Sequence, residues 1–307
     1  MKTGLPAGRN LINQWRPDVI FSSGPPFTAF LLAHRLGREF SIPWIADFRD
    51  LWVDDAYYNE PFWRRPVDIL LESTMVRSAA AVVTVSPLFA QQLEQRYGKP
   101  VATVCNGYSA EDFPSELPIN TAGEVLTIRH MGTIYLGYRD PSPLFAAIGL
   151  LPPALRDRVR VEFWGDSGNE LSRTAMAYGV ADRISSMPRI PYREALELQG
   201  RSDVLLLLQW NDTREAGNLP AKLFEYIYAR RPLLMIGYER GIAAGMVRER
   251  AGFVSCAPEC ICAQLRQWIE EKQAGRLSAL DPSVYVGLSR DEQFAKLDQV
   301  FALIADQ

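Results

Sequence analysis

The sequence is poor in the residues that build metal centres and disulfide frameworks. Its 307 residues include four cysteines and two histidines. A structural zinc site needs four ligands with paired spacing, and neither histidine lies near the cysteines in sequence. We therefore expect no metal and no disulfide, and we interpret the three clustered cysteines as small apolar side chains around a loop and a helix start. The cysteines are Cys105, Cys256, Cys260 and Cys262.

Long apolar runs and an excess of basic charge are also missing. No run of 18 or more apolar residues occurs, so we expect no membrane-spanning helix. The net charge is -3, which argues against a nucleic-acid-binding protein. Lys2 and Arg9 enclose no apolar segment, so the start is not typical of a signal peptide. With so few cysteines, a reducing, cytoplasmic location is the expected one.

What the chain does have is apolar material for about two domains, since 48% of its residues are hydrophobic. Short apolar runs alternate with amphipathic stretches, which predicts α/β architecture with two doubly wound parallel sheets in tandem. Strands are expected at 18–22, 43–47, 81–85, 101–104, 125–131, 159–163, 183–187, 203–208 and 232–236. Helices are expected at 27–38, 61–79, 87–97, 141–150, 168–178, 192–199, 219–229, 241–249 and 289–304.

A proline- and glycine-containing segment at 113–124 is the predicted linker between the two domains. The first domain, 1–116, then has four strands, where a dinucleotide-type domain has five or six. Either this domain is abbreviated, or the N-terminal strands of a longer parent are missing. The second domain covers 124–288.

Ligands of open parallel sheets bind at the carboxyl ends of the strands, so the segments that follow the strands are informative. Ser23 and Gly24 follow the first strand, where they form either a wall of an inter-domain cleft or an ordinary turn. Asp47, Asp50 and Trp52 follow the second strand. Their carboxylates could accept hydrogen bonds from sugar hydroxyls and the indole could stack on a sugar; the alternative is an Asp-Arg ion pair that shapes the loop.

Two segments of the second domain indicate anion binding. Gly132 and Gly137 bracket a loop that opens into a helix, and Arg139 could pair with a diphosphate. Further on, a Gly-Asn turn is followed by Pro220 at the expected first helical position, with Lys222 in the first turn. The alternative is a helix with solvated charged side chains.

The sequence resembles the family-4 type of retaining glycosyltransferases with the glycosyltransferase-B fold. The similar segments, in order, are PDVIFSSGPP at 17–26, DFRDLW at 47–52, VTVSP at 83–87, NGYSAEDF at 106–113, GTIYLGYRDP at 132–141 and NLPAKLFEY at 218–226. The resemblance implies two Rossmann-like domains that face each other across a cleft, with the donor in the second and the acceptor in the first. It also implies that the last helix, 289–307, packs back on the first domain.

The family carries two glutamates, and Glu225 matches the one that binds the ribose. The other would fall at Gly217, and the family's histidine near the donor sugar falls at Ser22 or Ser23. Members usually have further residues at the N-terminus. The expected donor-binding residues are Gly132, Thr133, Arg139, Arg189, Ile190, Asn218, Leu219, Pro220, Lys222 and Glu225. On the acceptor side we expect Ser23, Gly24, Asp47 and Trp52.

The resemblance implies a glycosyltransferase that moves a sugar from a nucleotide-diphosphate sugar to an acceptor hydroxyl with retention, in bacterial polysaccharide or glycolipid biosynthesis. We expect a UDP-sugar as co-substrate, with no cofactor. Arg139 and Lys222 would stabilise the departing diphosphate, and Asp50 would lie where the acceptor enters.

Two alternatives stay open: a nucleotide-sugar epimerase of the same fold, and a non-catalytic nucleotide-sugar-binding protein. An epimerase needs acid and base side chains around the sugar, and only His34 and His130 are available as histidines, the latter inside a predicted strand.

The helix at 61–79 combines aromatic, apolar and basic residues, as a helix at a membrane interface does. The commoner explanation is a helix that packs on the sheet and keeps its charged face in water. The acceptor is therefore either a sugar or a lipid-linked molecule, and peripheral contact with the inner face of the membrane stays an open alternative.

Overall fold

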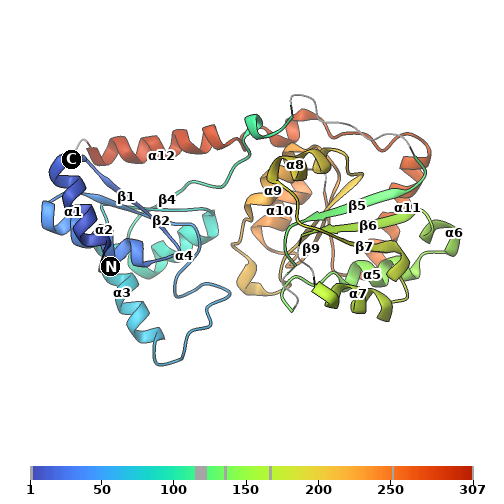
Figure 1. Cartoon of the computed structure of the whole chain (residues 1–307), viewed down its shortest axis with the longest axis horizontal. Coiled ribbons are helices and arrows are strands. Elements are labelled where there is room, and N and C mark those ends of the chain that lie inside the picture. The colour runs from blue at the N-terminus through green and yellow to red at the C-terminus, as the bar shows by residue number, and fades with distance from the viewer. Residues whose placement is uncertain (1–2, 115–122, 135–136, 166–167, 251, 306–307) are drawn as a thin grey trace. The chain divides into compact units, whose positions relative to one another are not determined.

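The computed structural model describes residues 3–114, 123–134, 137–165, 168–250 and 252–305. The chain divides into two compact units, Met1–Asn106 with Arg290–Gln307, and Gly107–Ser289 (Figure 1). The division falls before the predicted linker, because Tyr108 stacks on Tyr228 of the second unit with ring centroids 4.2 Å apart and Phe113 contacts the same ring at 4.6 Å. Residues 115–122 of that predicted linker lie outside the described residues.

The first unit contains a four-stranded parallel sheet whose strands neighbour one another in chain order. The strands are β1 (Ile20–Gly24), β2 (Trp44–Phe48), β3 (Ala81–Thr84) and β4 (Val101–Thr103), each within two residues of its predicted position at both ends. The helices are α1 (Gly4–Gln14), which the sequence analysis missed, α2 (Thr28–Phe40), α3 (Arg65–Ser78), α4 (Pro87–Tyr97) and α12 (Arg290–Ala305).

Both faces of this sheet are covered. On one face, Phe30 of α2 and Phe48 of β2 are wholly buried and meet edge to face at 4.9 Å. On the other face, Ile304 of α12 packs with Ile45 and Val83. A helix from the far end of the chain thus completes the core of the first unit.

The second unit contains a six-stranded parallel sheet in the order β10-β9-β8-β5-β6-β7. Numbered from β5, this is the dinucleotide-binding strand order 3-2-1-4-5-6. The strands are β5 (Leu126–Met131), β6 (Val159–Trp164), β7 (Ile184–Met187), β8 (Val204–Leu208), β9 (Leu233–Ile236) and β10 (Phe253–Val254). The helices are α5 (Ser142–Leu150), α6 (Pro153–Arg156), α7 (Gly168–Ala177), α8 (Tyr192–Gly200), α9 (Ala221–Tyr228), α10 (Ile242–Glu249) and α11 (Pro258–Gln273).

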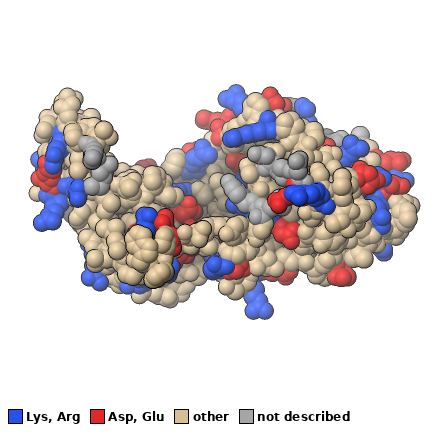
Figure 2. All heavy atoms as spheres, turned by 60° about the horizontal axis from the view of Figure 1, so that its bottom comes forward, with Lys and Arg blue, Asp and Glu red and all other residues tan. Residues whose placement is uncertain are grey.

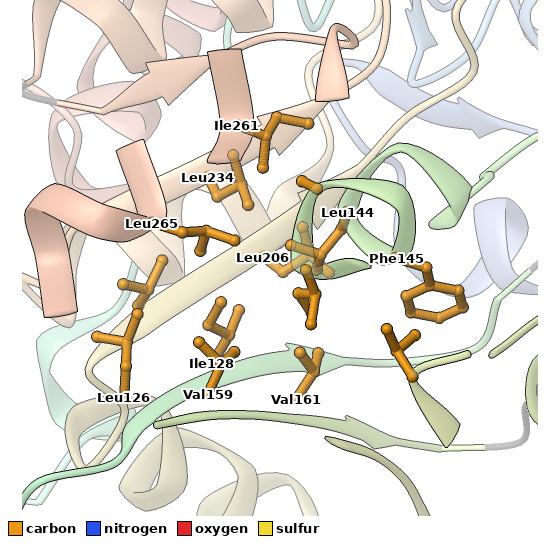
Figure 3. Packing of buried hydrophobic residues seen from close by; sticks show 14 of the residues in the cluster. Leu126, Ile128, Leu144, Phe145, Val159, Val161, Leu206, Leu234, Ile261 and Leu265 are labelled. Carbon is orange, nitrogen blue, oxygen red and sulfur yellow. The ribbon is translucent and has the colours of Figure 1, made fainter. Parts of the chain in front are cut away.

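The core of the second unit forms where α5 and α11 cover one face of its sheet (Figure 3). Wholly buried strand residues such as Ile128, Val161 and Leu206 pack there against Leu144 and Leu265. The sequence analysis missed α11, although its buried positions 261, 265, 268 and 269 have helical spacing. Cys262 lies in this core, which agrees with an apolar role for that cysteine.

Within the described residues, no helix combines the length and the apolar character that spanning a bilayer requires.

Candidate functional site

The polar side chains of the second unit gather where its strand order reverses. β5 lies between β6, which follows it in the chain, and β8, which comes later. Ligands of open parallel sheets bind outside the carboxyl ends of the strands at this switch point. The segments that begin at Gly132 and at Gln209, together with the start of α9, emerge there.

Two side chains of α9 fasten this helix to the end of β5. The Lys222 ammonium donates a hydrogen bond to the carbonyl oxygen of Met131 at 2.8 Å, and the Met131 N–H donates to the Tyr226 hydroxyl at 2.8 Å. Lys222 and Tyr226 are four residues apart and so lie on one face of the helix. Their bonds fix the start of α9 directly beside Gly132.

Gly132 must be a glycine for two reasons. Its φ is 116°, in the region that favours glycine. A Cβ there would also lie 2.9 Å from the Lys222 ammonium nitrogen. Gly165, at the end of β6, packs against Gly132 so closely that a Cβ on it would lie 2.9 Å from the Gly132 carbonyl carbon. Close backbone approach therefore shapes this end of the sheet.

Two cations and one carboxylate act on one another near Gly132. Burial and the nearby Arg139 guanidinium lower the pKa of Lys222 to about 8, while Glu225 acts in the opposite direction. His130 is wholly buried, and burial, with Lys222 and Arg139 adding to it, lowers its pKa to about 3. A neutral His130 donates from Nδ1 to the Leu206 carbonyl at 2.9 Å. We call Gly132, Arg139, Lys222 and the start of α9 the anion cradle.

Glu225 is held in place by two residues of α8. Its Oε1 accepts from the Tyr192 hydroxyl at 3.0 Å, and its Oε2 accepts from the Gln199 amide at 3.3 Å. Gln199 is buried, whereas Tyr192 is exposed. The sequence analysis did not identify either partner, because contacts between helices that are far apart in the chain leave no local pattern.

The turn before α9 is organised around Glu215, a residue that the sequence analysis also missed. Glu215 is 3% exposed, and its Oε2 accepts from the Asn218 side-chain amide at 2.8 Å. The predicted donor residue Asn218 therefore uses its side chain within the turn. Gly217, where the family has a glutamate, is buried.

The sequence predicted Pro220 at the first helical position, and this is wrong by one residue, because Pro220 precedes the helix. Its ψ of 138° is extended, so it is the N-cap and α9 begins at Ala221. Leu219 beside it is 3% exposed, so its side chain belongs to the core and only its backbone can face a ligand.

The remaining predicted donor residues lie in segments next to the residues already described. Thr133 follows Gly132 and is exposed. Arg189 and Ile190 lie between β7 and α8, just before Tyr192; Arg189 is exposed and Ile190 is half-buried.

The predicted acceptor residues of the first unit meet at the ends of β1 and β2. The Ser23 hydroxyl donates to Asp47 Oδ2 at 2.8 Å, and an Arg49 nitrogen lies 3.7 Å from Asp47 Oδ1. Burial raises the pKa of Asp47, which Arg49 and Ser23 partly offset. Arg49 also donates to the side chain of Asn106, so the ion pair considered from the sequence is present within a larger polar cluster. Asp50 is exposed beside it.

Gly24 and Trp52 both lie against the ring of Phe27. A Cβ on Gly24 would lie 2.7 Å from the ring of Phe27, and Trp52 stacks on that same ring with centroids 4.7 Å apart. One face of the Trp52 indole is therefore already covered by protein, which removes that face from sugar binding.

Among the described residues, no group of three or more His, Cys, Asp or Glu side chains could hold a metal ion. Asp54, which the sequence places beside Asp55, forms ion pairs with Arg65 and Arg96 at 3.5 Å and 2.5 Å.

Comparison with known proteins agrees with this architecture. Residues 3–107 match the family model described as Glycosyl transferase 4-like domain. No curated protein sequence matches the chain. Solved structures that resemble it include sucrose-phosphate synthase from Thermosynechococcus elongatus, with a TM-score of 0.68 and 13% identity over 99% of this chain and 78% of that one.

Anabaena HepE in complex with UDP has a TM-score of 0.69 and 13% identity, over 98% of this chain and 82% of that one. A putative UDP-N-acetylglucosamine 2-epimerase from Listeria monocytogenes has a TM-score of 0.58 and 14% identity, over 98% of this chain and 78% of that one. At such identities the likeness shows the fold, which is the glycosyltransferase-B fold. The family match and this fold together support a glycosyltransferase.

Proposed function

We propose that this chain, which carries a glycosyl transferase 4-like domain within the glycosyltransferase-B fold, transfers a sugar from a UDP-sugar to an acceptor hydroxyl. The observation that carries the proposal is the anion cradle. Lys222 and the start of a helix lie beside Gly132, and burial together with the charge of Arg139 lowers the pKa of Lys222 to about 8. A diphosphate would supply the negative charge that offsets this repulsion.

The chemistry of the cradle suits departure of a nucleoside diphosphate. As the bond between the sugar and the phosphate breaks, negative charge grows on the phosphate oxygens and the sugar becomes oxocarbenium-like. Arg139, Lys222 and the N–H groups at the start of α9 would stabilise that charge. The reaction needs no metal for this role, because the cations are supplied by the protein.

Glu225 supports a ribose beside the diphosphate. It lies one turn after Lys222 on α9; the buried Gln199 fixes its Oε2, and the exposed Tyr192 hydroxyl bonds to its Oε1. A carboxylate accepts hydrogen bonds from two vicinal hydroxyls, which is the use that nucleotide-binding folds make of acidic residues. Backbone groups near Arg189 and Ile190 would contact the base.

For the acceptor we propose the polar cluster of Ser23, Asp47 and Asp50, with a sugar or lipid-linked hydroxyl as the nucleophile. Retention of the anomeric configuration, and a place in bacterial polysaccharide or glycolipid biosynthesis on the cytoplasmic side of the membrane, belong to the same proposal and follow from the family resemblance. Asp50 is the exposed carboxylate of this cluster, whereas Asp47 is 4% exposed and its Oδ1 lies 3.7 Å from an Arg49 nitrogen.

The alternative activity is isomerisation of a nucleotide-sugar, because a putative UDP-N-acetylglucosamine 2-epimerase has a similar fold. It requires an acid and a base near the sugar. His130, the histidine of the second unit, is wholly buried in β5 with a pKa of about 3, which is unsuited to proton transfer near neutral pH. Incubation with a labelled UDP-sugar distinguishes transfer, isomer exchange and binding without turnover.

The donor assignment is tested by calorimetry with UDP, GDP, ADP and TDP on the wild-type chain and on Arg139→Ala and Glu225→Ala. We expect UDP to bind, and Arg139→Ala to weaken it by roughly 10- to 100-fold, because charge-assisted hydrogen bonds contribute about 1.5–3 kcal/mol. Glu225→Ala should weaken binding of the nucleoside diphosphate but leave the affinity for inorganic diphosphate unchanged.

Arg160→Ala and Glu194→Ala are matched controls, since both side chains are exposed on the second unit and lie in neither predicted role. UDP affinity that is unchanged in both site variants, or equally weakened in both controls, removes the site assignment.

A further inference from the structure

The helix α3 packs Met75 and Val76 into the core, but it also buries two carboxylates and exposes aliphatic side chains. Its charged residues Asp68 and Glu72 are 2% and 1% exposed, whereas Val67 and Leu70 are 51% and 67% exposed. The sequence had suggested a helix that packs on the sheet and keeps its charged face in water; Met75 and Val76 do pack in the core and the arginines are exposed, but the two carboxylates are buried. A helix that buries carboxylates and exposes aliphatic side chains needs a reason for both.

The buried carboxylates have a structural role. The Glu72 carboxylate accepts from the backbone N–H of Val53 at 2.9 Å and from the Tyr97 hydroxyl at 2.6 Å. Asp68 accepts from the Tyr58 hydroxyl at 2.9 Å. Together these bonds tie the segment that precedes α3 to the helix itself. The segment and the first turns of α3 therefore form one ordered projection of the first unit (Figure 1).

Two strongly exposed aromatic side chains lie on this projection. Phe62 and Trp63 are 90% and 64% exposed and come directly before α3. Val67 and Leu70 are three residues apart in α3 and share one side of that helix, while Phe62 and Trp63 lie in the turn before it. We call Phe62, Trp63, Val67 and Leu70 the α3 tip.

Three exposed arginines flank the α3 tip, of which Arg64 forms ion pairs with Glu60 and Asp68, and Arg65 with Asp54. Arg64 and Arg65 are exposed between the aromatic pair and Val67, and Arg77 is exposed further along the same helix face. Glu60 is the exposed carboxylate nearest in sequence, and Arg64 pairs with it at 2.9 Å. Asp68, which lies among these residues in sequence, is buried and faces inward. In Figure 2, where the bottom of Figure 1 comes forward, uncharged residues predominate on the forward face of this unit.

We propose that the α3 tip inserts into the headgroup region of an anionic lipid bilayer. Trp and Phe beside Arg are the side chains of interfacial anchors, because aromatic rings enter the boundary region while guanidinium groups pair with lipid phosphates. The whole chain carries a net charge of -3, so the attraction comes from the local arginines and not from overall charge.

This inference deepens the proposed lipid-linked acceptor. The segment fastened by Glu72 and Asp68 begins directly after Asp50, the predicted acceptor-side residue. Membrane contact at the α3 tip would therefore bring a bilayer close in sequence and structure to the end of β2. It does not depend on the anion cradle, which lies in the other unit.

The test is co-sedimentation of the full chain with vesicles of phosphatidylcholine alone and of an equimolar mixture with phosphatidylglycerol. We expect binding to the anionic vesicles that weakens with added salt. Phe62→Ser/Trp63→Ser should lower the partition coefficient by about tenfold or more. Arg65→Gln/Arg77→Gln should lower it on anionic vesicles and remove the preference for them over neutral ones.

The matched control is Leu11→Ser/Trp15→Ser, since Trp15 is 67% exposed on α1, close to the 64% of Trp63. This variant should bind vesicles as the wild type does. UDP calorimetry on every variant separates this inference from the donor site, because both pairs lie outside the second unit. Absent vesicle binding, or equal loss in control and tip variants, overturns the proposal. So does dimerisation in solution that the tip variant abolishes without any vesicle binding, because the surface would then pair two copies of the chain.

Discussion

Lys222 links the electrostatics of the anion cradle to a measurable pH dependence. Its pKa is about 8 without a ligand, because it is buried and lies near Arg139. A bound diphosphate favours the protonated form and so raises this pKa. Affinity is then fully present below about pH 7 and is lost as the pH rises through 8, by up to about tenfold per unit.

We therefore expect the UDP dissociation constant to be constant from pH 6 to 7 and to rise above pH 8 in the wild type. Lys222→Met should bind more weakly and lose this rise, while Arg139→Lys should keep it. Calorimetry across this range in buffers of matched ionic strength measures the effect. A wild-type affinity that is independent of pH up to 9.5 contradicts the assignment of Lys222.

Tyr192 competes with a ribose for Glu225, because its hydroxyl already donates to Glu225 Oε1. Tyr192→Phe removes this donor and retains the ring. We expect UDP to bind a few-fold more tightly to this variant, since a neutral-to-charged hydrogen bond contributes on the order of 1 kcal/mol. Gln199→Leu should weaken UDP binding, because Gln199 is buried and orients the Glu225 carboxylate. Equal weakening by both variants would mean that Tyr192 positions Glu225 instead.

At the scale of elements, the junction of β5 and α9 decides where the cradle lies. Tyr226 is wholly buried and its hydroxyl accepts the Met131 N–H. Tyr226→Phe leaves that buried N–H without its partner, which should cost about 1–3 kcal/mol of unfolding free energy. UDP affinity should fall as well, because α9 then loses one of its two bonds to β5.

Chemical denaturation and calorimetry on the same samples measure both effects. Tyr178→Phe is the control, because Tyr178 is 43% exposed in the same unit and its loss of a hydroxyl should change neither quantity. A Tyr226→Phe protein with wild-type stability would show that this bond contributes nothing to docking of the helix.

At the scale of the molecule, α12 belongs to the first unit although it ends the chain. Its side chains Leu297, Val300, Phe301 and Ile304 pack with Ile45, Val83 and Val104. Ile304→Ala should lower the unfolding free energy of the first unit by about 2–5 kcal/mol, as for other large-to-small core changes. UDP affinity should stay at the wild-type value, because the cradle lies in the second unit.

Scanning calorimetry with and without UDP tests this division. UDP should raise the unfolding temperature of the transition that Leu206→Ala lowers, since Leu206 is in the second core. The transition lowered by Ile304→Ala should not respond to UDP. One transition that responds identically to both variants would contradict independent cores.

The sequence by itself determined the order of the strands along the chain and most helices, because apolar periodicity and turn residues are local. Ser86, for example, caps α4 through Phe89 N, as its place before Pro87 predicts. The sequence analysis did not predict short elements such as β10, with two residues, and α6, with four. The two-domain parallel-sheet fold was confirmed, together with the glycosyltransferase resemblance.

What only the tertiary structure decided was which distant side chains meet. Lys222 bonds to Met131, and Glu225 to Tyr192 and Gln199, through contacts between elements that no local pattern records. The same holds for Glu215, whose burial depends on the turn around it, and for α3, whose composition suits either orientation. The pairing of Asp68 and Glu72 with Tyr58 and Tyr97, together with the core packing of Met75 and Val76, set which of its faces is exposed, because a buried carboxylate needs hydrogen-bond donors that sequence spacing cannot supply.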